Sequence, residues 1–226
     1  MFKKLLLTST LLATFASAYA QQSAPFSVQG SVLPPPPKVT IANSGRADYG
    51  SLSTTTVKGY ASSIGINSLY SFPVVTLTYS ITFTAPAKAA LSFTDNNANN
   101  VLSFDSFDSI RFGVVDTGAT TIGSVAVSLT NTLIDGSPVS VFLSSPTGTT
   151  SWSANTVGGK TGIATNNVAP NYTKAFSKTA GATVPDSFTT LSGNLSMVLS
   201  VKKSLIDSAT TSTTATGSGT FTVVYL

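Results

Sequence analysis

The sequence predicts an all-β fold, either a sandwich or a barrel of short strands. Serine, threonine, glycine and β-branched residues dominate, and segments of alternating apolar and polar residues recur along the chain. Glycine, proline, asparagine or aspartate separates these segments, as is typical of turns between strands. We therefore expect few helices.

The first twenty residues have the features of an export signal. Lys3 and Lys4 give a positive start, residues 5–16 are apolar, and Ala18-Tyr19-Ala20 is a small-residue cleavage site. The apolar stretch is well short of the ~20 residues that span a bilayer, which argues against a membrane anchor. We expect a signal peptide at residues 1–20 and a mature protein that begins at Gln21.

The alternation over residues 24–32 predicts the first strand. One face of that strand carries Ala24, Phe26, Val28, Gly30 and Val32. Pro34–Pro37 follow as a stiff polyproline step. Because the step is pinned between two strands, a rigid spacer explains it better than a ligand for a proline-binding domain does.

The clearer strands of the remaining chain are those with the strongest alternation. They cover residues 39–42, 74–83, 89–94, 110–115, 125–130, 139–143, 195–201 and 220–226. Turn residues mark Asn43-Ser44-Gly45, Asp95-Asn96-Asn97, Asp135-Gly136-Ser137 and Pro146-Thr147-Gly148. Residues 151–185, which hold the only tryptophan, Trp152, are weakly patterned, and we interpret them as a long loop with short strands.

The last strand places Phe221, Val223 and Tyr225 on one face. Neither this strand nor the strand at residues 24–32 has a partner strand next to it in the sequence. Amphipathic strands at both ends of an all-β chain are well suited to edge pairing between separate molecules. This pattern predicts an assembly subunit rather than an enzyme.

The composition excludes further classes of function. Removal of the leader would lower the formal charge from +4 to +2, which predicts no nucleic-acid partner. Cysteine is absent, so the fold must be stable without disulfides, and the remaining 206 residues suit one β domain. Histidine and glutamate are also absent, which removes common general bases and metal ligands and predicts no catalysis and no cofactor.

One motif resembles an enzyme signature. Asp116-Thr117-Gly118, after an apolar strand, matches the loop of aspartic proteases, in which two aspartates share one proton. The chain has no second Asp-Thr-Gly or Asp-Ser-Gly. A homodimer could supply a second loop, but that family has a shorter chain and a distant apolar-Gly element, whereas Ile122-Gly123 follows at once. We interpret the motif as a turn.

Two weaker motifs have simpler explanations. Gly158-Gly159-Lys160-Thr161 resembles the end of a phosphate-binding loop, but Ala154 stands where its first glycine is required, so a hairpin turn is favoured. Residues 95–100, with Asp105 and Asp108, offer oxygen ligands for Ca²⁺. This cluster lacks the spacing of a calcium loop, and such turns are routine between strands, so we predict no metal site.

Several segments together resemble subunits of bacterial chaperone-usher fimbriae, in particular the family of beta-fimbriae probable major subunits. Residues 26–32 resemble a pilin donor strand with glycine at its fourth docking position, and Tyr225 matches the penultimate aromatic residue of pilins. The family's internal landmarks are matched in the right order by Asp48-Tyr49-Gly50, residues 85–91, Asp95-Asn96 and Phe112-Gly113. The resemblance covers essentially the whole mature chain.

The chain departs from this family at two points. Many members have a disulfide whose cysteines would fall near Pro37 and Phe83, and neither is present here. The usual glycine about fourteen residues from the pilin C-terminus is replaced by Thr213, with Gly217 and Gly219 nearer the end. These departures bear on the shape of the groove in which such subunits accept a donor strand more than on the class of protein.

The resemblance implies an immunoglobulin-like, pilin-like β-sandwich over residues 34–226 that lacks one strand, preceded by a donor-strand extension at residues 21–33. A periplasmic chaperone would fill the open groove first, and the donor strand of a neighbouring subunit would replace it at the outer-membrane usher. On this expectation the protein is exported through the periplasm to the surface fimbrium. Residues Ala24, Phe26, Val28, Gly30 and Val32 would form the donor face, and Phe221, Val223 and Tyr225 would lie on the acceptor strand.

Three alternatives remain open at this stage. A minor or tip adhesin usually has an additional N-terminal binding domain, and a donor strand this close to the mature N-terminus argues against one. A free-standing secreted sandwich would fold residues 24–32 back into its own sheet. A secreted aspartic protease is disfavoured by the single Asp-Thr-Gly.

Overall fold

The structure, a computed structural model, describes residues 35–63, 68–98, 102, 110–154, 156–157, 160–161 and 164–226. The predicted signal peptide and all five donor-face residues, Ala24, Phe26, Val28, Gly30 and Val32, lie outside the described residues. So do Gly158 and Gly159 of the phosphate-loop motif and Asn99, Asn100, Asp105 and Asp108 of the candidate calcium cluster.

The described chain is all-β with few helices, as the sequence predicts. Its short helices are η1 (Ala42–Gly45), α2 (Thr54–Lys58) and α3 (Lys203–Asp207). Its strands are β1 (Lys38–Ile41), β2 (Ser62–Ser63), β3 (Leu69–Ser71), β4 (Val75–Asp95), β5 (Arg111–Val115), β6 (Thr121–Ile134), β7 (Ser137–Pro138), β8 (Val141–Pro146), β9 (Thr156–Val157), β10 (Lys160–Thr161), β11 (Tyr172–Ser177), β12 (Ser187–Lys202), β13 (Thr216–Gly217) and β14 (Gly219–Tyr225).

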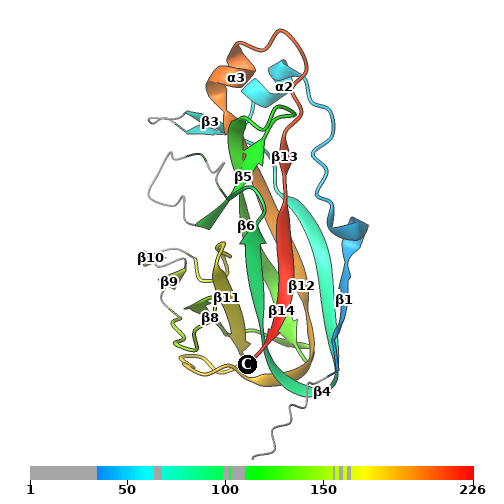
Figure 1. Cartoon of the computed structure of the whole chain (residues 1–226), viewed down its shortest axis with the longest axis vertical. Coiled ribbons are helices and arrows are strands. Elements are labelled where there is room, and N and C mark those ends of the chain that lie inside the picture. Colours follow the sequence, from blue (N-terminus) through cyan, green and yellow to red (C-terminus); the bar gives the residue numbers. More distant parts are fainter. Residues whose placement is uncertain are drawn as a thin grey trace, which may run out of the picture. The chain divides into compact units, whose positions relative to one another are not determined.

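The long strand β4 joins the two parts of a curled antiparallel sheet (Figure 1). Its first half pairs with β1 on one edge and β12 on the other, and β6 and β5 continue the sheet beyond β12. Its second half pairs with β14 and β11, and β8 continues beyond β11. The side chains of both parts enclose one main hydrophobic core.

The alternation predicts two strands, at residues 74–83 and 89–94, where the structure has the single strand β4. The predicted break corresponds to a register shift against β12, which pairs Phe188 with Ala87 but Thr190 with Thr82. Residues 84–86 are exposed at this point, and Pro86, which has no N–H to donate, is tolerated in such an irregular stretch. The strand bends there and passes from one part of the sheet to the other.

The weakly patterned segment at residues 151–185 contains a buried strand as well as short ones. β11 pairs with both β4 and β8, and five of its six residues are buried, including Thr173, Lys174 and Ser177. A strand that is covered on both faces and carries polar residues shows no apolar alternation. The sequence pattern predicted a long loop with short strands here and did not show that one of these strands is buried.

Candidate functional site

One free edge of the described sheet runs along β13 and β14 (Figure 1). β13 pairs with β5, and β14 pairs with the second half of β4 from Gly219 opposite Asp95 to Tyr225 opposite Ala89. The Asp95 carboxylate accepts a hydrogen bond of 2.7 Å from Gly113 N, which holds the end of β4 against β5. Strands β5 and β4 therefore pair with the same side of residues 216–225, and the other side of this segment faces outward.

The hydrogen bonds between β14 and β4 show which peptide groups of β14 lie on the outward side. Asn96 N donates to Ser218 O, and Leu226 N donates to Lys88 O, so the even-numbered residues of this segment bond to β4. The odd-numbered peptide groups point away from β4, and no strand of the described chain pairs with them. Their side chains nevertheless pack against the main core. These residues are Phe221, Val223 and Tyr225, the predicted acceptor positions.

The opposite wall is β1 with the segment that follows it. β1 pairs with β4 and with no other described strand. Ile41 packs against the main core, but Val39, two residues earlier and on the same face, is 43% exposed. The core-facing side of this edge is therefore open to solvent.

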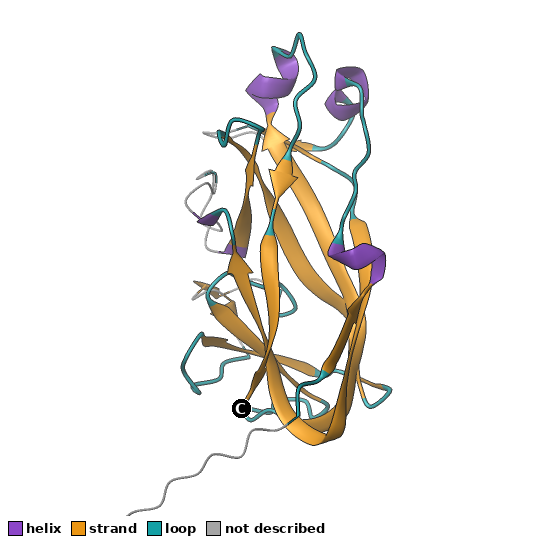
Figure 2. Cartoon of the chain, turned by 45° about the vertical axis from the view of Figure 1, so that its right-hand side comes forward, coloured by secondary structure: helices purple, strands orange, loops and turns teal. Residues whose placement is uncertain are grey.

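The space between the two edges is an apolar groove of about 540 Å³. Its walls are residues 41–49 and 215–221. Its floor consists of side chains of the core itself: Phe93, Phe112, Val125, Val127, Leu195, Met197 and Leu199. In Figure 2 the broad strands of the sheet are visible between β14 and β1. The groove is where one further strand would complete the core.

The lower end of the groove is bridged by Tyr225. Its hydroxyl donates to Pro35 O at 2.7 Å, which ties the end of β14 to the chain that enters β1. Its ring meets the ring of Phe83 edge to face at 5.6 Å. Tyr225 therefore both belongs to the predicted acceptor strand and sets the distance between the two walls at this end.

Tyr49 performs the corresponding function near the upper end. Its hydroxyl donates to Met197 O at 2.9 Å and accepts from Leu199 N at 3.0 Å. These two backbone groups of β12 lie where its pairing with β4 ends and its pairing with β3 begins, so the tyrosine provides hydrogen bonds that neither strand supplies. Burial raises the pKa of this hydroxyl, so it stays protonated and able to donate. Its ring contacts Phe72 edge to face at 5.7 Å. The sequence offered Asp48-Tyr49-Gly50 only as a landmark and did not predict this bond.

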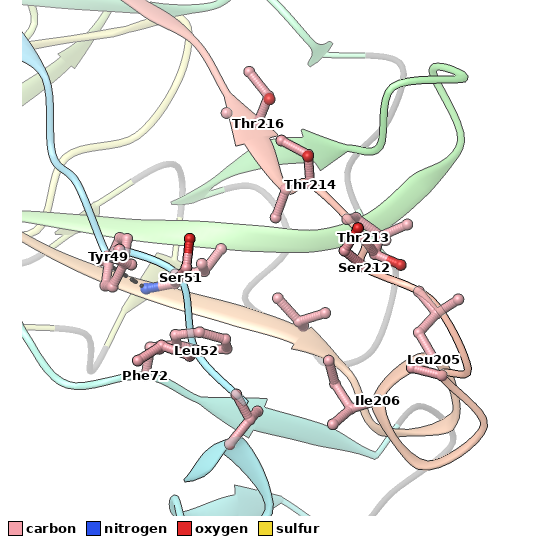
Figure 3. Close-up of a pocket in the computed structure, with 18 of the residues that line it drawn as sticks. Tyr49, Ser51, Leu52, Phe72, Leu205, Ile206, Ser212, Thr213, Thr214 and Thr216 are labelled. Carbon is pink, nitrogen blue, oxygen red and sulfur yellow. Dashed lines mark hydrogen bonds between the residues drawn. The ribbon is translucent and has the colours of Figure 1, made fainter. Parts of the chain in front are cut away.

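Above Tyr49 the groove widens into a cavity of about 860 Å³, which we call the upper cavity (Figure 3). Tyr49, Leu52 and Phe72 lie on one side of it, and Leu205 and Ile206 of α3 lie on the other. Residues 211–217 form a third wall, rich in serine and threonine. The upper cavity and the groove share Tyr49, Leu199 and Gly217 in their linings, so they lie next to each other.

The candidate catalytic motif is a tight turn. The Asp116 carboxylate accepts hydrogen bonds of 2.8 Å from both Gly118 N and Thr120 N between β5 and β6, as the turn interpretation predicts. Within the described residues, no group of three acidic, histidine or cysteine side chains could hold a metal ion. No helix in that part of the chain is both long and apolar enough to cross a membrane.

Sequence analysis did not detect one unusual buried residue. Lys174 of β11 is only 2% exposed, and its ammonium donates to Thr165 O at 2.8 Å. Burial lowers its pKa to about 7. A lysine in a strand without clear alternation carries no signal that would reveal its burial.

Comparison with known proteins gives no relative: no protein-family model, no curated protein and no solved structure matches this chain. The groove must therefore be interpreted from its own geometry.

Proposed function

We propose that this chain is a structural subunit of a surface fimbria, an immunoglobulin-like sandwich whose missing strand is supplied by residues 24–32 of a neighbouring copy. The observation that carries the proposal is the apolar groove between two edges that no described strand pairs with. An inserted strand would satisfy the free peptide groups and at the same time cover the half-buried side chains of the floor, Val125, Val127 and Met197. A periplasmic chaperone would use the same edge before polymerisation at an outer-membrane usher, and no catalysis is involved.

The donor segment fits the free edge in length and the groove in chemistry. Residues 24–32 equal in number residues 217–225, which form the free edge. Each fully buried Phe or Val side chain contributes ~1.5–3 kcal/mol, so Phe26, Val28 and Val32 can hold two subunits together without a covalent bond. Paired antiparallel to β14 from residue 24 beside Tyr225, the donor would bring Gly30 beside Gly219. There the Phe112 ring lies 3.4 Å from where a Cβ of Gly219 would be, so the space is narrow.

The position of Pro35 favours insertion into a neighbour over self-closure. Pro35 is bound at the lower end of the groove, and β1 runs from there towards the upper end. To enter its own groove, the preceding segment would have to reverse direction across residues 33–37, four of which are prolines. Proline holds φ near −65°, whereas the tight turns of hairpins require positive φ.

The same position gives the assembly its polarity. A donor antiparallel to β14 has its residue 32 at the upper end of the acceptor groove, so the donor subunit's lower end meets the acceptor's upper end. This contact joins two different surfaces and repeats indefinitely, which yields an open fibre. A donor parallel to β14 would join two lower ends and could close a dimer instead.

Gly30→Leu and Tyr225→Ala test the proposal from opposite sides of the contact. Gly30→Leu should overfill the narrow site at a cost of ~1–3 kcal/mol and block polymerisation, while the subunit still binds a peptide of residues 21–33. Tyr225→Ala should weaken peptide binding, because it alters the acceptor wall. Gln29→Leu and Thr222→Ala, on the outward faces, are the matched controls and should polymerise normally.

Two results would contradict this assignment. Equal peptide binding by the Gly30→Leu and Tyr225→Ala subunits would show that donor and acceptor functions are not separated as proposed. A monomeric protein whose melting temperature does not respond to the peptide would favour a self-closed sandwich.

A further inference from the structure

The upper cavity is not explained by a donor strand alone. The edge that can pair with a strand begins at Thr216, since residues 211–215, which also line the cavity, belong to no strand. Its other walls are side chains, chiefly Leu52, Phe72 and Ile206. An occupant of this space therefore gains from apolar contact and does not need to donate backbone hydrogen bonds.

The charge of the cavity also points to a neutral occupant. The charged side chains that line it, Arg46 and Asp48, form an ion pair with each other at 3.3 Å. The remaining polar lining consists of hydroxyl groups and backbone, among them Ser212, Thr213 and Thr214. No net charge is left to attract an ionic ligand.

The proposed register identifies which residues arrive there. If residues 24–32 of a neighbour cover 217–225, the next residues of that neighbour, Leu33 and Pro34–Pro36, must leave the strand edge at the upper cavity. In the described chain Pro35 and Pro36 are exposed at the subunit's own lower end, and although Pro35 O accepts from Tyr225, the exposed rings can contact another molecule. Polyproline advances ~3.1 Å per residue, and three prolines therefore cover ~9 Å between the two bodies.

We propose that the upper cavity binds Pro34–Pro36 of the neighbouring copy, so that the polyproline step is part of the intersubunit contact and not only a spacer. This inference rests on the proposed function. Proline lacks an N–H and suits a site beyond the end of the strand edge. Preformed polyproline segments bind aromatic-lined apolar surfaces with little loss of conformational freedom, and Tyr49 and Phe72 provide such a surface.

The experiment uses the full-length Gly30→Leu protein as the acceptor, since it cannot donate its own strand. Three peptides are compared by titration calorimetry: residues 21–33, residues 21–36, and residues 21–36 with the three prolines replaced by serine. We expect residues 21–36 to bind about tenfold more tightly than residues 21–33, and the serine peptide to lose that gain.

The cavity is tested with Leu52→Ser, which should abolish the gain from the prolines but leave binding of residues 21–33 unchanged. Leu52 is 40% exposed, so the substitution should not unfold the protein. Val74→Ser, at a residue 58% exposed that does not line the cavity, is the control and should keep the gain.

The possible failures are distinguishable. If residues 21–33 do not bind at all, the proposed function is wrong. If residues 21–33 bind and residues 21–36 bind equally well, the groove proposal stands and the polyproline contact is refuted. A gain retained by the serine peptide or by Leu52→Ser would also refute it.

Discussion

The buried Lys174 allows a quantitative test of the fold. Its ammonium lies in the interior with Thr165 O as its hydrogen-bond partner, and no salt bridge found among the described residues includes it. Burial lowers its pKa from 10.5 to about 7. Because one pKa unit corresponds to ~1.4 kcal/mol, this lysine destabilises the folded state near neutral pH by up to ~5 kcal/mol.

The sign of the pH dependence follows from proton binding. Between pH about 7 and 10.5 the unfolded chain keeps the Lys174 proton and the folded chain releases it. The free energy of unfolding should therefore rise with pH across this window and be independent of this group below it. Lys174→Met removes the titration, at the cost of leaving Thr165 O without its donor, ~1–3 kcal/mol. At pH 7 we expect a net gain of about 2 kcal/mol.

Urea unfolding of the wild type and Lys174→Met at half-unit steps from pH 7 to 9.5 measures the difference directly. The advantage of the methionine variant should shrink steadily as pH rises and reverse its sign before pH 9.5. Lys88→Met, at an exposed position of β4, is the control and should show a constant difference. A Lys174→Met difference that does not change with pH would refute the reasoning.

Two further predictions concern the β5–β6 turn and its surroundings. A Cβ at Gly123 would lie 2.2 Å from Ser200 O, so Gly123→Ala should lower the free energy of unfolding by ~3 kcal/mol or more in a urea titration, whereas Gly118→Ala, whose nearest contact would be 3.4 Å, should cost under ~1 kcal/mol. Asp116→Asn should cost ~1 kcal/mol through the turn, and neither it nor the wild type should cleave a peptide library at any pH. Peptidase activity abolished by Asp116→Asn would contradict the proposal that no catalysis is involved.

Local chemistry made part of the fold predictable from sequence. The turn at residues 43–45 forms where Asn43, Ser44 and Gly45 adopt positive φ of 52°, 52° and 77°, a conformation that asparagine and glycine favour. The strand at the start of β4 shows the predicted alternation in its burial from Leu77 to Phe83. In such segments one face meets the core and the other meets water, so the residue pattern records the structure.

Long-range pairing made the rest unpredictable. β12 extends back to Ser187, well before the predicted start at residue 195, because it is held by β4 and β6 through stretches that are rich in polar residues. A register shift near Asn194 accommodates Gly193, whose Cβ position would be 3.0 Å from the backbone of Thr132. Neither neighbour is close in sequence, so no local pattern shows where this strand begins.

The candidate site likewise has one part that the sequence predicts and another that it does not. Alternation alone placed Phe221, Val223 and Tyr225 on one face, and the structure packs all three against the main core, with Phe221 in the wall of the groove. The groove itself depends on which partner strands are absent from an edge, a property of the whole described sheet that no segment encodes by itself. The part that Tyr49 plays in the groove follows only from its hydrogen bonds to β12, some 150 residues away in the sequence.

The two tyrosines explain how an open groove can keep a defined width. Tyr225 ties β14 to Pro35 across the lower end, and Tyr49 ties the wall after β1 to β12 near the upper end. Between these two points no described strand joins the walls, so the groove between them stays open. A groove with fixed walls loses less conformational freedom when a strand enters than one that must first form, which favours tight assembly from short donor segments. If the proposed function holds, the bond to Pro35 has a second consequence, because it would also fix where the donor segment leaves its own subunit. On the proposed function, one tyrosine would therefore couple the shape of the acceptor site in each subunit to the direction in which that subunit donates.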